Sequence, residues 1–332
     1  MKNFLDLADF TREEVLALLE LARRLERHGA PRALAGKILG LLFFNPSLRT
    51  LASFQVAMAR LGGSSFVISP GQGTWQLELR TGVVMDGAAA EHVREGLPVL
   101  ASYCDALGIR AFAEGKDLAH DLAETSFSTM AALIDKPLIN LESAVNHPCQ
   151  ALADWKTLDD LAVPRHARFV LSWAYHPRAL PLAVPAAALH MAALRGMEVI
   201  VLRPEGFALP APLMERARRA AALGGGSVRE TSERAAALEG ARVLYVKEWG
   251  ATAAYGDAAE DARLRRSLTD WCVREEWFAP AAAECRVMHC LPVRRNTAIA
   301  DAVLDGPRSI VQREAYNRLP AQMAVLHQLL GA

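Results

Sequence analysis

The chain alternates between two patterns of hydrophobic residues. Short and nearly unbroken apolar runs, such as residues 38–44, are typical of parallel strands that are buried on both faces. After this run, apolar residues recur at helical spacing, at positions 51, 54, 58 and 61. The alternation predicts an α/β fold in which parallel strands are joined by helices.

The same alternation continues along the chain and predicts most of its elements. We expect strands at residues 38–44, 65–68, 106–109, 138–141, 168–173, 198–202, 242–246 and 286–289. We expect helices from a capping box at Thr11 and Glu14, from residue 47 or 48, up to about residue 102, after Pro181, at 211–223 and at 313–330. A chain of 332 residues is long for one hydrophobic core, so we expect two domains.

Composition narrows the class of protein. Hydrophobic residues make up 52% of the chain, which indicates a packed globular protein. Basic and acidic residues both number 37, so the overall charge favours neither nucleic acid nor a membrane as a partner, and any anion site must be local. The five cysteines form no CxxC motif, which favours reduced thiols in a cytoplasmic protein over disulfides or a metal site. We find neither a signal-peptide pattern nor an apolar run of membrane-spanning length.

Residues 43–50, Phe-Phe-Asn-Pro-Ser-Leu-Arg-Thr, form a strand-turn-helix motif. Asn45 and Pro46 end the strand, and Ser47 is a good N-cap for the helix that follows. A helix start presents N–H groups and the positive end of the helix dipole, and anions bind there. Thr50 adds a hydroxyl, and Arg49 adds a planar donor suited to phosphate or carboxylate oxygens. Taken alone, the motif fits an anion site and an ordinary capped helix equally well.

Other polar residues follow the predicted strands at their C-terminal ends, where open parallel sheets bind ligands. They are Arg110, Glu142, residues 147–150, Lys247 and residues 289–295. Trp75 lies in a glycine-rich polar loop, where a large aromatic side chain favours a ligand or interface contact. No GxGxxG or Walker motif opens a helix, which argues against a dinucleotide or a nucleoside triphosphate.

Four separated segments together resemble the aspartate/ornithine carbamoyltransferase family. They are Ser47-Leu48-Arg49-Thr50, Arg110, His147-Pro148-Cys149-Gln150 and His289-Cys290-Leu291-Pro292, in that family's order and spacing. The resemblance extends from the first helix to Asn317-Arg318. It implies two doubly wound parallel-sheet domains: a carbamoyl-phosphate-binding domain at 1–146, with a returning C-terminal helix at 310–332, and an acylornithine-binding domain at 147–309. It also implies a cytoplasmic homotrimer with shared active sites, a role in arginine biosynthesis, and neither cofactor nor metal.

The resemblance also implies roles for individual residues. The groups implied to bind carbamoyl phosphate are Ser47, Leu48, Arg49, Thr50, Trp75, Arg110, His147, Gln150, Leu291 and Arg318. Those implied to act in catalysis are Arg49, Thr50, Arg110, His147, Gln150, Cys290 and Arg318. Cys290 and Leu291 would offer backbone carbonyls to the carbamoyl NH₂, and Trp75 would reach across from a neighbouring subunit. One departure is Leu51, where the family usually has a second arginine.

The acceptor pocket resembles that of the N-acylornithine branch. Its implied residues are Glu142, His176, Arg178, Lys247, Arg294 and Ala90. Lys247 would repel a free α-ammonium but suits an acylated, uncharged α-nitrogen. N-acetyl enzymes of the branch carry a glutamate at the position of Ala90, where a carboxylate would oppose a succinyl group. One departure is residues 183–187, which lack the branch's usual asparagine.

The acceptor favoured by these residues is N-succinylornithine, because His176, Arg178 and Arg294 would supply positive partners for the extra acid group. N-acetylornithine is the alternative, followed by ornithine. A protein that binds carbamoyl phosphate without turnover is the alternative from another class. Some conspicuous residues are expected to be structural: Cys149 and Cys290 as small packed side chains, and the Arg265-Arg266 pair as a solvated face.

Overall fold

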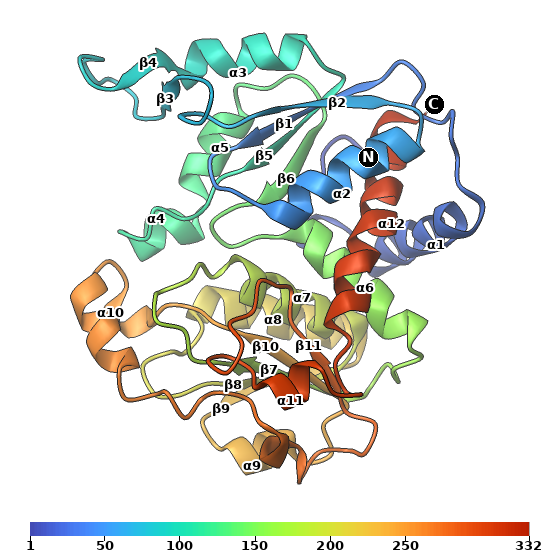
Figure 1. Cartoon of the computed structure of the whole chain (residues 1–332), viewed down its shortest axis with the longest axis vertical. Coiled ribbons are helices and arrows are strands. Elements are labelled where there is room, and N and C mark those ends of the chain that lie inside the picture. Colours follow the sequence, from blue (N-terminus) through green and yellow to red (C-terminus); the bar gives the residue numbers. More distant parts are fainter. Residues whose placement is uncertain (332) are drawn as a thin grey trace. The chain divides into compact units, whose positions relative to one another are not determined.

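The computed structural model describes residues 1–331, which fold into two compact units (Figure 1). The first unit contains residues 1–114, residues 119–149 and the chain from Arg318 onward, and the second contains residues 115–118 and 150–317. The expected fold class is confirmed, because both units combine helices with wholly parallel sheets and the end of the last helix returns to the first unit.

The first unit has a four-stranded sheet in the order β2-β1-β5-β6. Its strands are β1 (Ile38–Phe43), β2 (Ser64–Ile68), β5 (Ala106–Arg110) and β6 (Leu138–Glu142). Its helices are η1 (Leu7–Asp9), α1 (Arg12–His28), α2 (Leu48–Arg60), α3 (Val93–Ser102), α4 (Leu118–Leu122, which starts at the border of the second unit) and α5 (Thr125–Ala131). The chain winds outward from β1 in both directions, so the switch point, where such sheets bind ligands, lies between β1 and β5.

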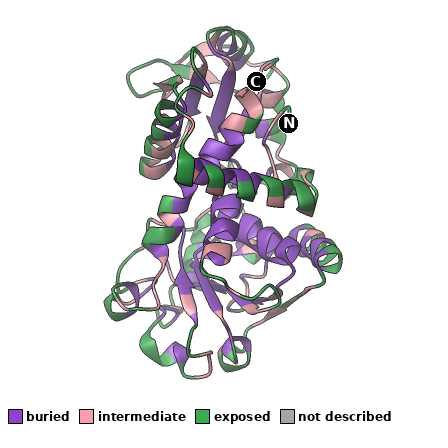
Figure 2. Ribbon diagram, turned by 90° about the vertical axis from the view of Figure 1, so that its right-hand side faces the viewer, coloured by how far each residue is buried: buried purple, intermediate pink, exposed green. Residues whose placement is uncertain are grey.

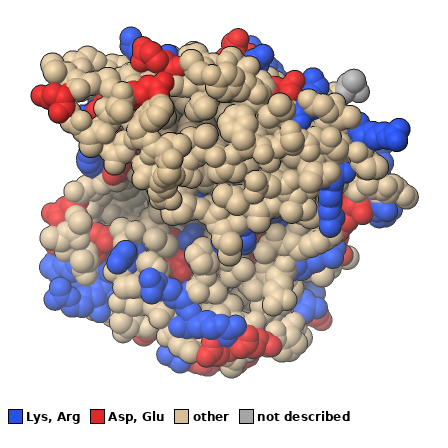
Figure 3. Space-filling view, turned by 45° about the horizontal axis from the view of Figure 1, so that its top comes forward, with Lys and Arg blue, Asp and Glu red and all other residues tan. Residues whose placement is uncertain are grey.

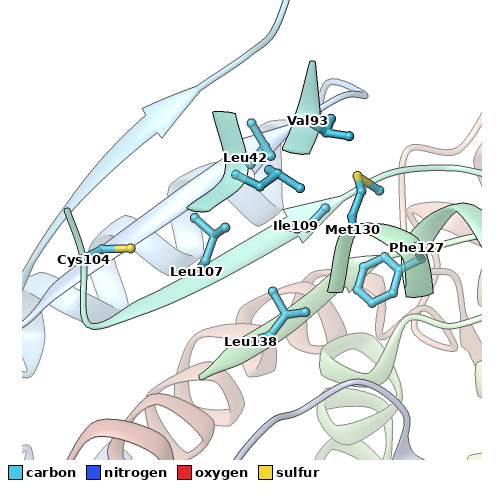
Figure 4. Close-up of a cluster of buried hydrophobic side chains, with 9 residues drawn as sticks. Leu42, Val93, Cys104, Leu107, Ile109, Phe127, Met130 and Leu138 are labelled. Carbon is cyan, nitrogen blue, oxygen red and sulfur yellow. The ribbon is translucent and has the colours of Figure 1, made fainter. Parts of the chain in front are cut away.

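A cluster of apolar side chains anchors this sheet to helices α3 and α5 (Figure 4). Leu42 and Ile109 are register partners on neighbouring strands, and Phe127 packs in the same cluster. None of the clustered core residues is more than 6% exposed. Burying one such side chain stabilises a fold by about 1.5–3 kcal/mol. The cluster therefore fixes β1 and β5, the two strands whose ends carry the 43–50 turn and Arg110.

The second unit has a five-stranded sheet in the order β11-β10-β7-β8-β9. Its strands are β7 (Arg168–Trp173), β8 (Glu198–Leu202), β9 (Ser227–Thr231), β10 (Val243–Lys247) and β11 (Arg286–Met288). Its helices are α7 (Ala183–Arg195), α8 (Ala211–Gly224), α9 (Arg234–Leu238), η2 (Thr252–Ala254), α10 (Ala258–Arg265), η3 (Glu275–Phe278) and α11 (Asp301–Leu304). Two further helices cross the border between the units: α6 (Pro148–Asp160) from residue 150 and α12 (Val311–Leu330) up to residue 317 belong to the second unit. The switch point of this sheet lies between β7 and β10.

Helix α7 is buried along its whole length. Figure 2 shows buried segments in purple and exposed segments in green. Its alanine-rich sequence allows close packing against α8 and β8. Although α7 is apolar, no helix within residues 1–331 combines the length and hydropathy needed to cross a bilayer.

Three strands escaped the sequence prediction because they lack an apolar run. β9 is a polar edge strand with the sequence Ser-Val-Arg-Glu-Thr. A separate ribbon in the first unit pairs β3 (Gln76–Glu78) with β4 (Ala89–His92) in parallel. The ribbon carries Ala90 and begins directly after Trp75, so it presents two of the residues predicted to shape the site.

Candidate active site

The turn after β1 is tied to the end of β5. The N–H of Phe44 donates to the carbonyl of Arg110 (3.0 Å), and the Oδ1 atom of Asn45 accepts from the N–H of Phe112 (2.8 Å). Ser47 has an extended backbone, and its Oγ accepts from the N–H of Thr50 (3.2 Å), so Ser47 is the N-cap of α2 as predicted. The positive end of α2 therefore lies at the switch point of the first sheet.

Three arginines and His147 gather at this turn. Arg110 forms an ion pair with Glu142, whose Oε2 atom lies 3.5 Å from Nε2 of His147. Arg318 of α12 donates to Oγ1 of Thr50 (2.6 Å). The positive charges of Arg318, Arg110 and Arg49 all act on His147. Five predicted carbamoyl-phosphate residues thus lie together in the first unit, and we call Arg49, Thr50, Arg110, His147 and Arg318 the cationic cluster.

The cationic cluster contains buried polar atoms that find no hydrogen-bond partner within residues 1–331. They are Nε of Arg110, Nδ1 of His147 and Nε of Arg318. Each unpaired buried donor or acceptor costs about 1–3 kcal/mol. Burial and the charges of Arg49 and Arg110 also lower the pKa of Arg318. A compact anion would supply acceptors and reduce the mutual repulsion of these arginines, so the cluster is suited to bind one.

Attraction of anions is a local property of this cluster. On the face shown in Figure 3, Lys and Arg side chains are interspersed with Asp and Glu. Thr50 is fully buried, and Arg110 and Arg318 are only 7% and 3% exposed. Charges in such a water-poor site interact more strongly than charges on the surface.

His147 is neutral at pH 7, because burial and the charges of Arg318, Arg110 and Arg49 lower its pKa well below the usual range. In the unfolded chain the pKa of a histidine is about 6.5. Below that pH the unfolded chain binds a proton that the folded chain does not, so the free energy of unfolding falls as the pH drops. We expect His147→Asn to lose less stability than the wild type between about pH 7.5 and about pH 5.5, measured by urea unfolding. Equal losses in the two proteins would show that His147 is not held neutral.

Cys149 is a packed residue, as predicted. Its side chain is fully buried, and burial raises the pKa of the thiol to about 12. A thiolate at this position is therefore not available at neutral pH. The structure gives Cys149 no role as a nucleophile.

Glu142, predicted to contact the acylornithine, lies among the groups predicted to bind carbamoyl phosphate. Its carboxylate pairs with Arg110 and lies beside His147, and it is only 8% exposed. In this position it orients Arg110 and offsets part of the positive charge of the cationic cluster.

Trp75 and Ala90 lie on the ribbon of the first unit. The indole Nε1–H of Trp75 donates to Oε2 of Glu91 (2.7 Å), yet the residue is 58% exposed. The register between β3 and β4 shifts so that Gln76 pairs with Ala89 and Leu77 with Glu91, which leaves Ala90 as the extra residue of a bulge. Ala90 is exposed, so its side chain is accessible to a ligand.

In the second unit, Gln150 and the 289–291 turn belong to one buried network. The Nε2 atom of Gln150 donates to Oδ1 of Asp154 (2.7 Å), while its Oε1 atom is buried without a partner within residues 1–331. The N–H of Leu291 donates to Nδ1 of His289 (2.9 Å). Leu291 has φ of +55°, a left-handed conformation that is uncommon for leucine and that clusters at functional sites.

Lys247 does not present the bare positive charge that its sequence position suggested. Its Nζ atom lies 2.8 Å from Oε2 of Glu248, and the other oxygen of Glu248 lies 3.3 Å from Nε2 of His289. Despite its burial, the pKa of Glu248 is lowered by the charge of Lys247 and its contact with His289. Repulsion of an α-ammonium by Lys247 is therefore weaker than predicted, because a buried carboxylate balances the lysine.

His176 is also not the positive partner that was predicted. Burial lowers the pKa of His176, and Nε of Arg294 donates to its Nε2 (2.9 Å). An imidazole nitrogen that accepts from a guanidinium carries no proton, so His176 is neutral and its Nδ1–H donates to the carbonyl of Arg178 (2.8 Å). The positive charges beside His176 come from Arg178 and Arg294, which are both exposed.

The prediction that Arg265 lies on a solvated face was wrong. Arg265 is 2% exposed, pairs with Asp261, and donates to the carbonyls of His176 (3.3 Å) and Arg178 (2.6 Å). Asp261 in turn accepts from the N–H of Ala251 (2.7 Å). This ion pair ties the 175–178 turn to the loop that follows Lys247. In the sequence, only the i, i+4 spacing of Asp261 and Arg265 indicates this ion pair.

Comparison with known proteins shows the family to which the chain belongs. The family model for the aspartate/ornithine carbamoyltransferase carbamoyl-P binding domain matches residues 2–160, and that for the Asp/Orn binding domain matches residues 184–329. The N-acetylornithine carbamoyltransferase of Xanthomonas campestris pv. campestris is 37% identical, covering 100% of this chain and 98% of its own. The N-succinylornithine carbamoyltransferase of Bacteroides thetaiotaomicron is 34% identical, covering 89% of this chain and 87% of its own.

Solved structures give the same result. An acetylornithine transcarbamylase complexed with acetylcitrulline has a TM-score of 0.95 at 37% identity, covering 100% of both chains. An N-acetyl-L-ornithine transcarbamylase variant, in which a glutamate is replaced by alanine, was complexed with carbamyl phosphate and N-succinyl-L-norvaline; its TM-score is 0.94 at 37% identity, covering 99% of this chain and 100% of its own. On this evidence the chain is a carbamoyltransferase and belongs to the aspartate/ornithine carbamoyltransferase family.

Proposed function

We propose that the protein transfers the carbamoyl group of carbamoyl phosphate to the side-chain amine of N-succinylornithine, giving N-succinylcitrulline and phosphate. The observation that carries the first half of this proposal is the cationic cluster at the start of α2, in which Arg49, Arg110 and Arg318 surround a neutral His147. Such a cluster suits a small dianion with a reactive carbonyl beside its phosphate. The reaction would place the enzyme in arginine biosynthesis.

In the proposed reaction, the amine nitrogen attacks the carbamoyl carbon and a tetrahedral oxyanion develops. Thr50, Arg110 and His147 would donate hydrogen bonds to that oxygen. Because Oγ1 of Thr50 accepts from Arg318, its own hydroxyl hydrogen is left to point at a ligand. Losing one such donor typically costs about 3–4 kcal/mol of transition-state stabilisation.

The second step breaks the bond between the carbamoyl carbon and the phosphate oxygen. Arg49 and the N-terminus of α2 would stabilise the charge that gathers on the leaving phosphate. The attacking amine must be neutral, and for a pKa near 10.4 its deprotonation at pH 7 costs about 4.6 kcal/mol. After the attack the nitrogen carries an extra proton, which we assign to the departing phosphate, so that the step needs no protein base.

The choice of succinylornithine depends on Ala90, with Arg178 and Arg294 as the positive groups for its carboxylates. A small, exposed, uncharged side chain at the ribbon bulge leaves room for a second acid group. Relatives in which a glutamate is replaced by alanine or serine were complexed with N-succinyl-L-norvaline, which supports this choice. N-acetylornithine is the second candidate, because relatives of that name match the chain over its full length.

We further propose that the protein is a cytoplasmic homotrimer with shared active sites. Large exposed apolar side chains are concentrated in the first unit: Leu48, Val56, Trp75, Leu79, Val84, Met85, Val99 and Tyr103. Exposed apolar groups in such number favour contact with another chain, and Trp75 would then reach a neighbouring site. The five cysteines are all buried thiols, as expected of a protein from a reducing compartment.

The test is to incubate the protein with carbamoyl phosphate and four amines in turn: N-succinylornithine, N-acetylornithine, ornithine and aspartate. We expect a ureido product, detected by colorimetry, with the highest kcat/KM for N-succinylornithine. A higher value for N-acetylornithine would overturn the choice of acceptor. Binding of carbamoyl phosphate without product from any amine would instead favour a sensing protein.

A further inference from the structure

Five buried side chains of the second unit converge in one network, which includes Gln150. They are Gln150 and Asp154 of α6, Tyr245 of β10, His289 after β11 and Glu314 of α12, none more than 1% exposed. Asp154 accepts from Nε2 of Gln150 (2.7 Å) and from the hydroxyl of Tyr245 (3.0 Å). Glu314 accepts from the backbone N–H of His289 (2.8 Å), and its other oxygen lies 3.4 Å from Nε2 of Gln150.

The two carboxyl groups, Asp154 and Glu314, share this interior through a side-chain hydrogen bond. Two carboxylates cannot both be ionised at such a contact in a water-free site. Burial, followed by the charge of Asp154, raises the pKa of Glu314 well above its ordinary value. Burial and the charge of Asp154 likewise raise the pKa of Tyr245, so its hydroxyl remains a donor. At neutral pH the pair therefore holds one proton, carried by Glu314 and donated to Asp154.

This arrangement dictates the orientation of the Gln150 amide. Its NH₂ group meets both carboxyl groups, and a flipped amide would place Oε1 against them instead. Oε1 therefore points away from the two carboxyl groups, and it is a buried acceptor that has no partner within residues 1–331. Glu314 also accepts a hydrogen bond from the backbone N–H of His289. His289 is the first residue of the turn that continues with Cys290 and Leu291.

We propose that Asp154 and Glu314 are positioning residues that aim Oε1 of Gln150 and the carbonyls of Cys290 and Leu291 at the carbamoyl NH₂. The inference rests on the proposed function, because the carbamoyl NH₂ is the donor that these acceptors would hold. Neither residue touches the substrate in this account. Misplacing a reacting group by about 1 Å can cost about 100-fold in rate.

The test compares Glu314→Gln with Glu314→Ala. Glutamine can accept from the N–H of His289 and donate to Asp154, as the protonated carboxyl does, and it loses only the long contact from Nε2 of Gln150 (3.4 Å). Alanine loses all three contacts. We expect Glu314→Gln to keep kcat within about threefold of the wild type, and Glu314→Ala to lose about 100-fold in kcat with a smaller change in the KM for the acceptor. Gln312→Ala, at an exposed position of the same helix, is the matched control and should leave kcat unchanged.

Two results would overturn the positioning role: equal losses of kcat in Glu314→Gln and Glu314→Ala, or full activity in a folded Glu314→Ala. A crystal structure of Glu314→Ala gives a readout that does not depend on activity. We expect it to show the Gln150 amide rotated and the 289–291 turn displaced; an unchanged amide and turn would contradict the inference. If the wild type forms no ureido product with any amine, the proposed function fails, and the crystal structure still decides whether the pair holds Gln150.

Discussion

Replacing Arg49 by alanine is expected to lower kcat/KM for carbamoyl phosphate by about 1,000-fold. Arg49 lies in the first turn of α2, next to Thr50, and its charge acts on both His147 and Arg318. Removing it would take one of the three arginines from the cationic cluster, and the one that lies in the first turn of α2. The change is measured by steady-state kinetics with carbamoyl phosphate as the varied substrate.

Two matched variants separate charge from geometry. Arg49→Lys keeps the charge but not the planar pair of donors, so we expect it to recover only part of the loss. Arg60→Ala removes an exposed arginine from the other end of the same helix and should leave kcat/KM unchanged. If the Arg49→Ala enzyme has the same kcat/KM as the wild type, the cationic cluster does not act in the reaction as proposed.

Replacing Ala90 by glutamate is expected to shift the preference from N-succinylornithine toward N-acetylornithine by about 30- to 100-fold. A carboxylate at the ribbon bulge would face the succinyl carboxylate, and two like charges about 4 Å apart at a partly exposed site repel by several kcal/mol. The neighbouring Glu91 does not exert this effect in the wild type, because its carboxylate accepts the indole hydrogen of Trp75. The ratio of the two kcat/KM values measures the shift.

Ala90→Gln is the control, because it adds almost the same volume without the charge. If the glutamine variant shifts the preference as far as the glutamate variant, steric exclusion decides the acceptor. An unchanged ratio in Ala90→Glu would show that the ribbon bulge does not face the acyl group.

The parts of the fold that could be predicted from the sequence have local causes. Residues 38–50 place an apolar strand, a strand-ending Asn-Pro and an N-cap in direct succession, and the structure has a strand and a helix there. β9 could not be found in this way, because an edge strand needs no continuous apolar run. The ribbon of β3 and β4 is too short to show any period.

The electrostatic environment of Lys247 and His176 could not be predicted from the sequence, because it depends on partners that the fold brings together. The carbonyls held by Arg265 are 87 and 89 residues away in the chain. Glu248 follows Lys247 directly, and in a regular strand such neighbours would lie on opposite faces, but β10 ends at Lys247 and the alternation ends with it. The neutral state of His176 likewise follows from Arg294, which is 118 residues away.

The pairing of Lys247 and the neutral state of His176 change the predicted electrostatics of the acylornithine-binding residues. With Lys247 balanced by Glu248 and His176 neutral, discrimination against free ornithine can no longer depend on those two side chains. Arg178, Arg294 and Ala90 remain as the groups that we propose distinguish one acceptor from another.

The central claim is that the start of α2 and the cationic cluster hold carbamoyl phosphate, and a crystal structure with that compound bound tests it most directly. We expect its phosphate within hydrogen-bonding distance of the N–H groups of residues 48–50 and of Arg49. We expect its carbonyl oxygen beside Thr50, Arg110 and His147. Carbamoyl phosphate bound elsewhere, with residues 47–50 making no contact to it, would contradict the account.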